Sequence, residues 1–162
     1  MKMRTLKRIA LPLTVIGLWL ILLAARPLTA AGPDAVIVLT TGEPEKIVAS
    51  LPLEAGAPFH LDYINSIYLQ PVRETFVYEP KEGLFVIAVE TPSAGVFVYL
   101  DLVPQEPGKA RLRRKLEEIR LLSTDYRNHR LTVGATVLPL KGLAPDGLTL
   151  ILRVLPGRQC AP

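Results

Sequence analysis

Short segments of alternating or continuous apolar residues recur along most of this chain, and glycine or proline separates nearly all of them. Alternation with a period of two places the apolar side chains on one face of a β-strand. No helix long enough to connect parallel strands recurs between the segments, so a parallel sheet is not expected. The pattern predicts strands at residues 35–40, 46–53, 59–63, 72–79, 84–90, 96–103, 131–137 and 148–155.

The stretch 109–122 has a different periodicity. Leu112, Leu116 and Ile119 follow the i, i+4, i+7 spacing of one helix face. We therefore expect one short amphipathic helix here. Together with the strands, it predicts an all-β fold, an antiparallel β-sandwich or barrel-like domain that carries a single short helix.

A basic N-terminus precedes a long apolar run. Residues 9–25 carry no charge and would span about 25 Å as a helix, close to a ~30 Å hydrocarbon core. The basic residues place the N-terminus inside and the rest of the chain outside. Residues 29–31 are small, so residues 1–32 are either a cleaved signal peptide or a signal-anchor transmembrane helix. The length of the run favours the anchor.

This topology predicts an extracytoplasmic β domain over residues 33–162. If the helix is retained, the protein is a single-pass protein of the cell membrane with its C-terminal domain outside the cytoplasm. If it is cleaved, the domain is exported to the periplasm or the extracellular face.

The positive charge of the chain belongs mostly to its N-terminal segment. The net charge is +4, but residues 1–32 hold five of the 19 Lys and Arg residues and none of the 15 Asp and Glu residues. The remainder is close to neutral, which argues against nucleic acid as a partner. Within the helix expected at 109–122, Arg113 and Arg114 could contact anionic lipid or an acidic protein, or could lie on a solvated face.

Signals for chemistry are sparse. The sequence has no glycine-rich phosphate loop, no Gly-x-Ser-x-Gly nucleophile motif and no His-Glu-x-x-His zinc motif. His60 and Asp62 share one strand face but lack a third metal ligand, His129 is expected in a solvated loop, and Cys160 has no adjacent base. We expect no catalytic residues, no metal and no cofactor, and therefore no enzyme.

Glu74 is the unusual residue of the predicted strand 72–79. Alternation places it on the apolar face with Val72 and Phe76, where an ionised carboxylate is costly unless it is hydrogen-bonded. Antiparallel pairing with strand 59–63 would bring Glu74 beside Tyr63 and the loop that begins with Asn65 and Ser66. We expect Glu74 to accept hydrogen bonds from Ser66 and loop amides as a brace for that loop, with a ligand-binding carboxylate as the alternative.

A family resemblance is carried by four short motifs within residues 35–155. They are Tyr63, Asn65-Ser66, Pro71-Val72-Arg73-Glu74 and Ser93-Ala94-Gly95, and the stretch from Asn128 to Val154 adds a similar closing segment. These motifs resemble a small family of exported bacterial proteins known as domain of unknown function 1850. Asn65 stands where the family often has a histidine, and Ser93-Ala94-Gly95 is shorter than the family's glycine-rich turn.

The resemblance implies a role beside a transporter, because genes of this family tend to lie next to permeases of TAXI-type TRAP transporters. We therefore expect a membrane-tethered extracytoplasmic accessory protein that contacts such a permease or its solute receptor. The alternative is an independent envelope domain that binds a small ligand. Candidate residues for ligand or partner binding are Tyr63, Asn65, Ser66, Glu74, Ser93, Gly95, Arg113 and Arg114.

Overall fold

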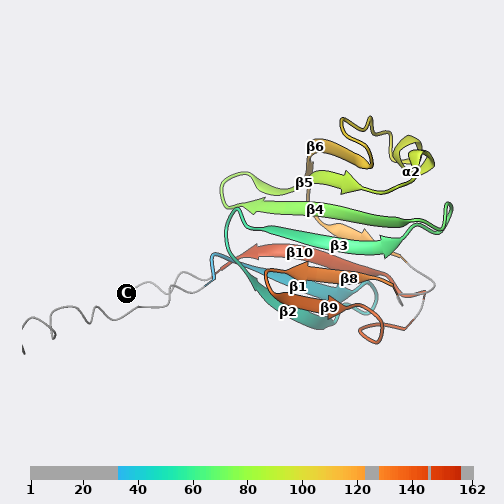
Figure 1. Ribbon diagram of the computed structural model, residues 1–162. Coiled ribbons are helices and arrows are strands. Elements are labelled where there is room, and N and C mark those ends of the chain that lie inside the picture. Colours follow the sequence, from blue (N-terminus) through green and yellow to red (C-terminus); the bar gives the residue numbers. More distant parts are fainter. Residues whose placement is uncertain (1–32, 123–127, 146, 158–162) are drawn as a thin grey trace, which may run out of the picture. The chain divides into compact units, whose positions relative to one another are not determined.

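Strands from both ends of the chain meet in the structure, a computed structural model that describes residues 33–122, 128–145 and 147–157. Within these ranges ten strands form two antiparallel sheets (Figure 1). The elements are β1 (Ala35–Thr41), β2 (Ile47–Leu53), β3 (Pro58–Ile64), β4 (Pro71–Glu79), β5 (Gly83–Glu90), α2 (Ala94–Tyr99), β6 (Lys109–Leu116), β7 (Ile119–Leu121), β8 (Arg130–Val133), β9 (Thr136–Pro139) and β10 (Leu150–Pro156).

One sheet has the order β2-β1-β10-β7 and the other the order β6-β5-β4-β3-β8-β9. A single buried cluster combines Ile37 and Leu152 of the four-stranded sheet with Phe59 and Phe76 of the six-stranded sheet. The rings of Phe59 and Phe76 stack with their centroids 5.2 Å apart. The apolar faces of both sheets therefore share one core, and the antiparallel all-β prediction is confirmed for this part of the chain.

The prediction of a helix at 109–122 is wrong, because this stretch forms β6 and β7. A spacing of four between Leu112 and Leu116 fits a helix, but it is also an even number and suits a strand equally well. In β6 three consecutive basic residues, 113–115, separate these leucines. The strand pairs with β5, whose apolar edge would otherwise remain unpaired.

The strand predicted at 96–103 is also wrong, because residues 94–99 form α2. A continuous apolar run does not distinguish a strand from a buried helix. The local signal is Ser93, whose side chain accepts a hydrogen bond from the Val96 amide at 3.3 Å and caps the helix. Val96 and Phe97 then pack in a second buried cluster with Val72.

Residues 131–137, predicted as one strand, form a hairpin instead. Val133 of β8 pairs with Thr136 of β9, so Gly134 and Ala135 make a two-residue turn. Gly134 has φ +55°, a conformation that glycine adopts without the steric cost of a side chain. Because the alternation of apolar and polar residues continues through the turn, periodicity alone does not reveal the turn.

The ends of the described domain lie side by side. The Gly157 amide donates to the Asp34 carbonyl at 2.8 Å, next to the paired ends of β1 and β10. The loop of residues 65–70, between β3 and β4, lies at the opposite end of the sheets together with α2 (Figure 1). We call this end, formed by residues 65–70 and α2, the α2 end.

The predicted signal or anchor segment, residues 1–32, lies outside the described residues. In the ranges that the structure does describe, no helix has the length and apolar character needed to cross a membrane. The assignment of residues 1–32 and 33–162 to two separate domains stays a prediction.

Candidate functional site

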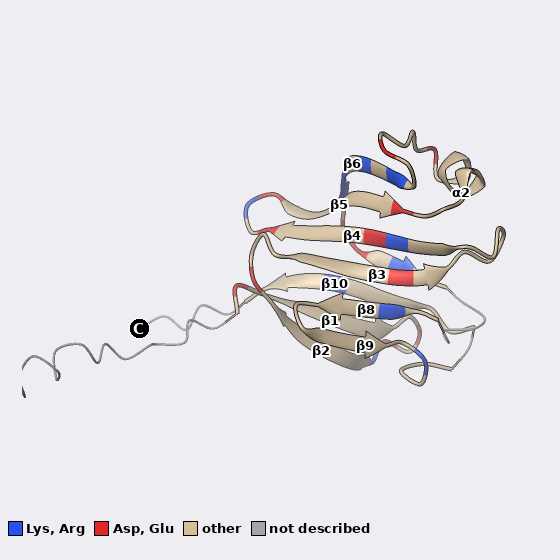
Figure 2. Ribbon diagram, in the orientation of Figure 1, with Lys and Arg blue, Asp and Glu red and all other residues tan. Residues whose placement is uncertain are grey.

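Charges of alternating sign cross the outer face of the six-stranded sheet in one row. The strand registers align Arg130 of β8, Asp62 of β3, Arg73 of β4, Glu90 of β5 and Lys109 of β6 (Figure 2). Each charge therefore has an opposite charge on the neighbouring strand. Cross-strand pairs of this kind stabilise a sheet modestly.

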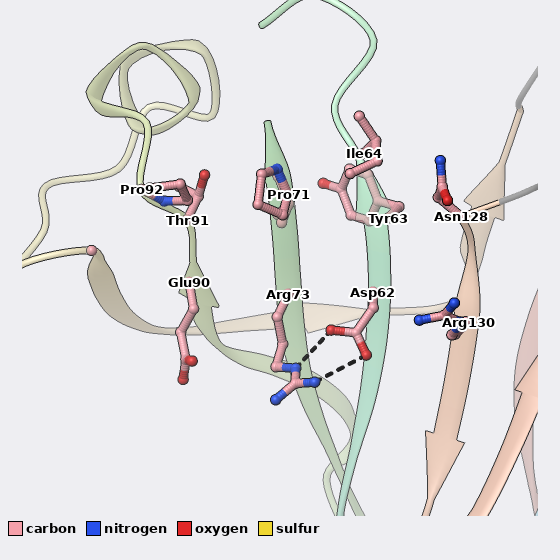
Figure 3. A pocket seen from close by; sticks show the side chains of 12 residues that line it. Asp62, Tyr63, Ile64, Pro71, Arg73, Glu90, Thr91, Pro92, Asn128 and Arg130 are labelled. Carbon is pink, nitrogen blue, oxygen red and sulfur yellow. Dashed lines mark hydrogen bonds and ion pairs between the residues drawn. The ribbon is translucent and has the colours of Figure 1, made fainter. Parts of the chain in front are cut away.

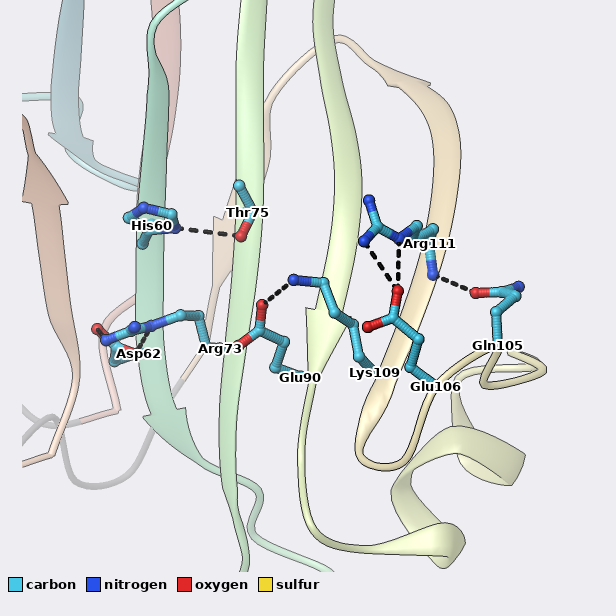
Figure 4. A network of polar contacts seen from close by, with 9 residues as sticks. All are labelled: His60, Asp62, Arg73, Thr75, Glu90, Gln105, Glu106, Lys109 and Arg111. Carbon is cyan, nitrogen blue, oxygen red and sulfur yellow. Dashed lines mark hydrogen bonds and ion pairs between the residues drawn. The ribbon is translucent and has the colours of Figure 1, made fainter.

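Most charges in this row are already neutralised by their neighbours. Arg73 donates to both carboxylate oxygens of Asp62, at 2.7 and 3.2 Å (Figure 3). Lys109 donates to Glu90 at 2.7 Å, and the adjacent Arg111 binds Glu106 (Figure 4). A hollow of about 610 Å³ opens over this face. Three of its charged side chains are already bound within the chain, Asp62 and Arg73 to each other and Glu90 to Lys109, which leaves them little capacity to bind a ligand.

The next row of the same sheet faces the core and has the opposite character. It aligns Leu131, Leu61, Glu74, Val89 and Ala110. The four apolar members are buried, and Glu74 is the charged member among them. A carboxylate in an apolar row costs stability, so its presence points to a role other than packing.

Tyr63 supplies a hydrogen bond to this carboxylate. Its hydroxyl donates to Glu74 Oε1 at 2.8 Å, and its ring stacks on His129 with centroids 5.8 Å apart. Burial raises the pKa of Glu74, while the hydrogen bond from Tyr63 and the positive charge of Arg114 lower it by less. Burial also raises the pKa of Tyr63, helped by the charge of Glu74, so the phenol stays protonated as a donor.

Glu74 lies between two adjoining hollows. The larger, about 530 Å³, is also lined by Tyr63, Asn65, Ser66, Tyr99 and His129. The smaller, about 250 Å³, is also lined by Leu112 and Arg114. The two share Glu74, Leu100, Ile119 and Arg120. We call this pair of hollows the Glu74 cleft; the larger one has the size of a small-molecule site.

The loop at 65–70 is shaped by Asn65. This residue is buried, and its Oδ1 accepts hydrogen bonds from the Ile67 and Tyr68 amides at 3.0 and 2.9 Å. Tyr68 in turn packs directly over Gly95 of α2, and a side chain at Gly95 would collide with its ring. The loop and the helix therefore hold each other in place.

The hydrogen bonds expected between Glu74 and the loop that begins with Asn65 and Ser66 are not the ones observed. Glu74 accepts from Tyr63 and not from Ser66, and Asn65 rather than Glu74 binds the loop amides. An asparagine side chain reaches amides two and three residues later, so it can satisfy the turn locally. Glu74 is thus left facing the cleft.

Six of the eight predicted site residues gather at one end of the sheet. Tyr63, Asn65, Ser66 and Glu74 line the larger hollow, while Ser93 and Gly95 begin α2. The role of His129 was missed, because nothing in its sequence neighbourhood indicates that its ring stacks on Tyr63.

Arg113 and Arg114 do not form the basic patch expected of a helix face, because adjacent residues of a strand point to opposite faces. Arg113 binds Glu79 and Glu82 at 2.8–2.9 Å and lies over the Phe85 ring. Arg114 lines the smaller hollow of the Glu74 cleft. Only Arg114 contributes to the site.

Large apolar side chains are exposed at the α2 end, beside the mouth of the cleft. Ile67 is 58% exposed and Val98 is 78% exposed, and Leu69 and Tyr99 are exposed as well. Of the two non-glycine residues with positive φ in the described ranges, Leu69 lies here and Asp101 lies two residues after α2. Strained backbone of this kind persists where the surrounding structure enforces it, often at functional sites.

Comparison with known proteins gives no match for this chain, whether to a family model, a curated protein or a solved structure.

Proposed function

We propose that this protein is a membrane-tethered extracytoplasmic accessory domain that docks a partner protein through the α2 end. The observation that carries the proposal is the group of exposed apolar side chains on residues 65–70 and α2, which Asn65 and the Tyr68–Gly95 contact hold fixed. A fixed apolar surface loses little conformational entropy on docking and gains from leaving water.

The position of the α2 end supports this role. The start of β1 pairs with the end of β10 at the opposite end of the sheets (Figure 1). The α2 end therefore lies away from the point at which the chain enters the described domain.

The partner that we propose is the permease or the solute receptor of a TAXI-type TRAP importer, as the family resemblance implies. Docking should depend on apolar contact rather than on the basic residues of β6. Lys109, Arg111 and Arg113 are each engaged by a carboxylate of this chain.

The test is co-purification of the tagged full-length chain from native membranes, with the permease and the receptor quantified separately. The double variant Ile67→Glu/Val98→Glu should lose at least about tenfold of the captured partner, because both charges would be desolvated in the interface. Val137→Glu is the matched control, since Val137 is also exposed, at 55%, but lies on β9.

Equal capture by the double variant and the control would overturn docking through the α2 end. Loss of capture in the control variant as well would also contradict it, since the effect would then not belong to this surface.

An independent envelope domain that binds a small ligand is the second candidate. The observation that favours it is the Glu74 cleft, which combines a hydrogen-bonded carboxylate with apolar walls.

A further inference from the structure

Two opposite charges face the Glu74 cleft without forming an ion pair with each other. Glu74 comes from β4 and Arg114 from β6, and both line the smaller hollow. The charge of Arg114 influences Glu74, yet the ion pairs of the described residues do not include one between them. Each is therefore available to a group of the opposite sign.

Other charged side chains around the cleft are already paired. Arg120 donates to one oxygen of Glu118 at 2.5 Å, and Arg153 donates to the other at 2.8 Å. Arg113, next to Arg114 in sequence, is bound by two carboxylates on the outer face. Glu74 and Arg114 thus differ from their neighbours, because they line the cleft without an ion-pair partner among the described residues.

The wall near these two charges is apolar. Val89, Leu100, Leu102 and Leu112 line the smaller hollow with them. A purely cationic ligand would meet the positive charge of Arg114, and a purely anionic one would meet the carboxylate of Glu74. A molecule that carries both charges and a hydrocarbon portion avoids both conflicts.

We propose that the Glu74 cleft binds a small zwitterion with an apolar body, such as an aliphatic amino acid. Its ammonium group binds the Glu74 carboxylate, its carboxylate binds the Arg114 guanidinium, and its hydrocarbon portion packs against Leu100 and Leu112. Tyr63, stacked on His129, fixes the orientation of the Glu74 carboxylate. This inference does not depend on docking at the α2 end, because its residues and its probes are different.

The experiment uses four probes with the purified full-length chain in lipid nanodiscs, measured by saturation-transfer NMR up to about 10 mM. L-Leucine and 6-aminohexanoate are isomeric zwitterions that differ in the separation of their charges. 4-Methylpentanoate and 3-methylbutylamine each lack one charged group of leucine. At least one zwitterion should bind about tenfold more tightly than both single-charge analogues, since about 1.4 kcal/mol corresponds to a factor of ten.

Variants identify the site. Glu74→Gln keeps an acceptor for Tyr63 but removes the charge, and Arg114→Gln removes the opposite charge. Each should raise the Kd of the zwitterion at least about tenfold. Arg113→Gln is the matched control, because it removes the neighbouring charge on the other face of β6 and should leave the Kd unchanged.

Absence of saturable binding by both zwitterions overturns the proposal. So does a single-charge analogue that binds as tightly as the better zwitterion, or an Arg114→Gln variant that binds like the original chain. Melting curves of the three variants establish that each is folded when it is measured.

Discussion

Glu74 is held in an environment that favours its neutral form, and this gives the fold a pH dependence. Burial raises the pKa of the folded-state carboxyl above its ordinary value of 4.5. The folded chain therefore keeps this proton at a higher pH than the unfolded chain does. The ionisation penalty is absent below the unfolded-state pKa, grows as the pH rises toward the folded-state pKa, and is complete above it.

Glu74→Gln should remove that penalty. At about pH 7 the variant should melt at a higher temperature than the original chain, and at about pH 3 the difference should be much smaller. Thermal melts followed by circular dichroism at both pH values provide the measurement. A melting-temperature difference of the same size at both pH values would contradict a raised pKa for Glu74.

Asn65 determines the conformation of residues 65–70. Asn65→Ala leaves the Ile67 and Tyr68 amides without their acceptor and should lower the free energy of unfolding by about 1–3 kcal/mol. Asn65→Asp keeps an oxygen acceptor in the same position and should cost clearly less. Urea unfolding of both variants tests this, and equal losses would show that the acceptor is not what matters.

The site could be predicted in part from the sequence. Period-two alternation correctly places Glu74 on the apolar side of its strand, and antiparallel pairing brings it near Tyr63. The donor to its carboxylate could not be predicted, because the orientation of Tyr63 involves His129, which is far away in sequence. Arg114 was predicted to lie on the face of a helix. In the structure it belongs to strand β6, and its side chain lines the cleft.

At the scale of elements, the outer charged row shows how neighbouring strands select their register. A shift of β4 by one residue against β3 would separate Arg73 from Asp62 and would turn the apolar face of β4 outward. The charged row and the apolar row therefore favour the same alignment. Burial of apolar side chains and pairing of charges thus both favour the observed register of β3 and β4.

The Asp62–Arg73 pair should make a small, salt-sensitive contribution to stability. A double-mutant cycle with Asp62→Asn and Arg73→Gln should give a coupling of about 0.5–1 kcal/mol, because both side chains are partly exposed. In ~1 M NaCl the coupling should fall toward zero. A coupling that persists in high salt would show that the pair is more strongly desolvated than its exposure indicates.

Two of the mispredicted elements share one cause. Both segments, 109–116 and 94–99, are short, and the spacing of their apolar residues fits a helix as well as a strand. Local periodicity therefore does not decide between the two. In β6 the deciding factor is the unpaired edge of β5, and in α2 it is the Ser93 cap together with the cluster around Phe97. Such tertiary factors are not visible in a window of a dozen residues.

At the scale of the whole molecule, the N-terminal segment determines where the protein resides. We predict that residues 9–25 remain as a membrane anchor, because a basic flank precedes an apolar run close to spanning length. Intact-mass measurement of the protein extracted from membranes should give the mass of the uncleaved chain. A mature form that begins near Gly32 would contradict the anchor and leave only export.

The pairing of β1 with β10 makes completion of the chain a condition for forming the four-stranded sheet. β1 emerges first, yet both of its edges are satisfied only when β10, from the other end of the chain, is present. Closing so long a loop is entropically costly and slow, so the core side of β1 stays exposed until then. A chain shortened before Leu150 would keep an open edge and an uncovered core. Proteases would thus distinguish unfinished copies from finished ones without a dedicated recognition signal.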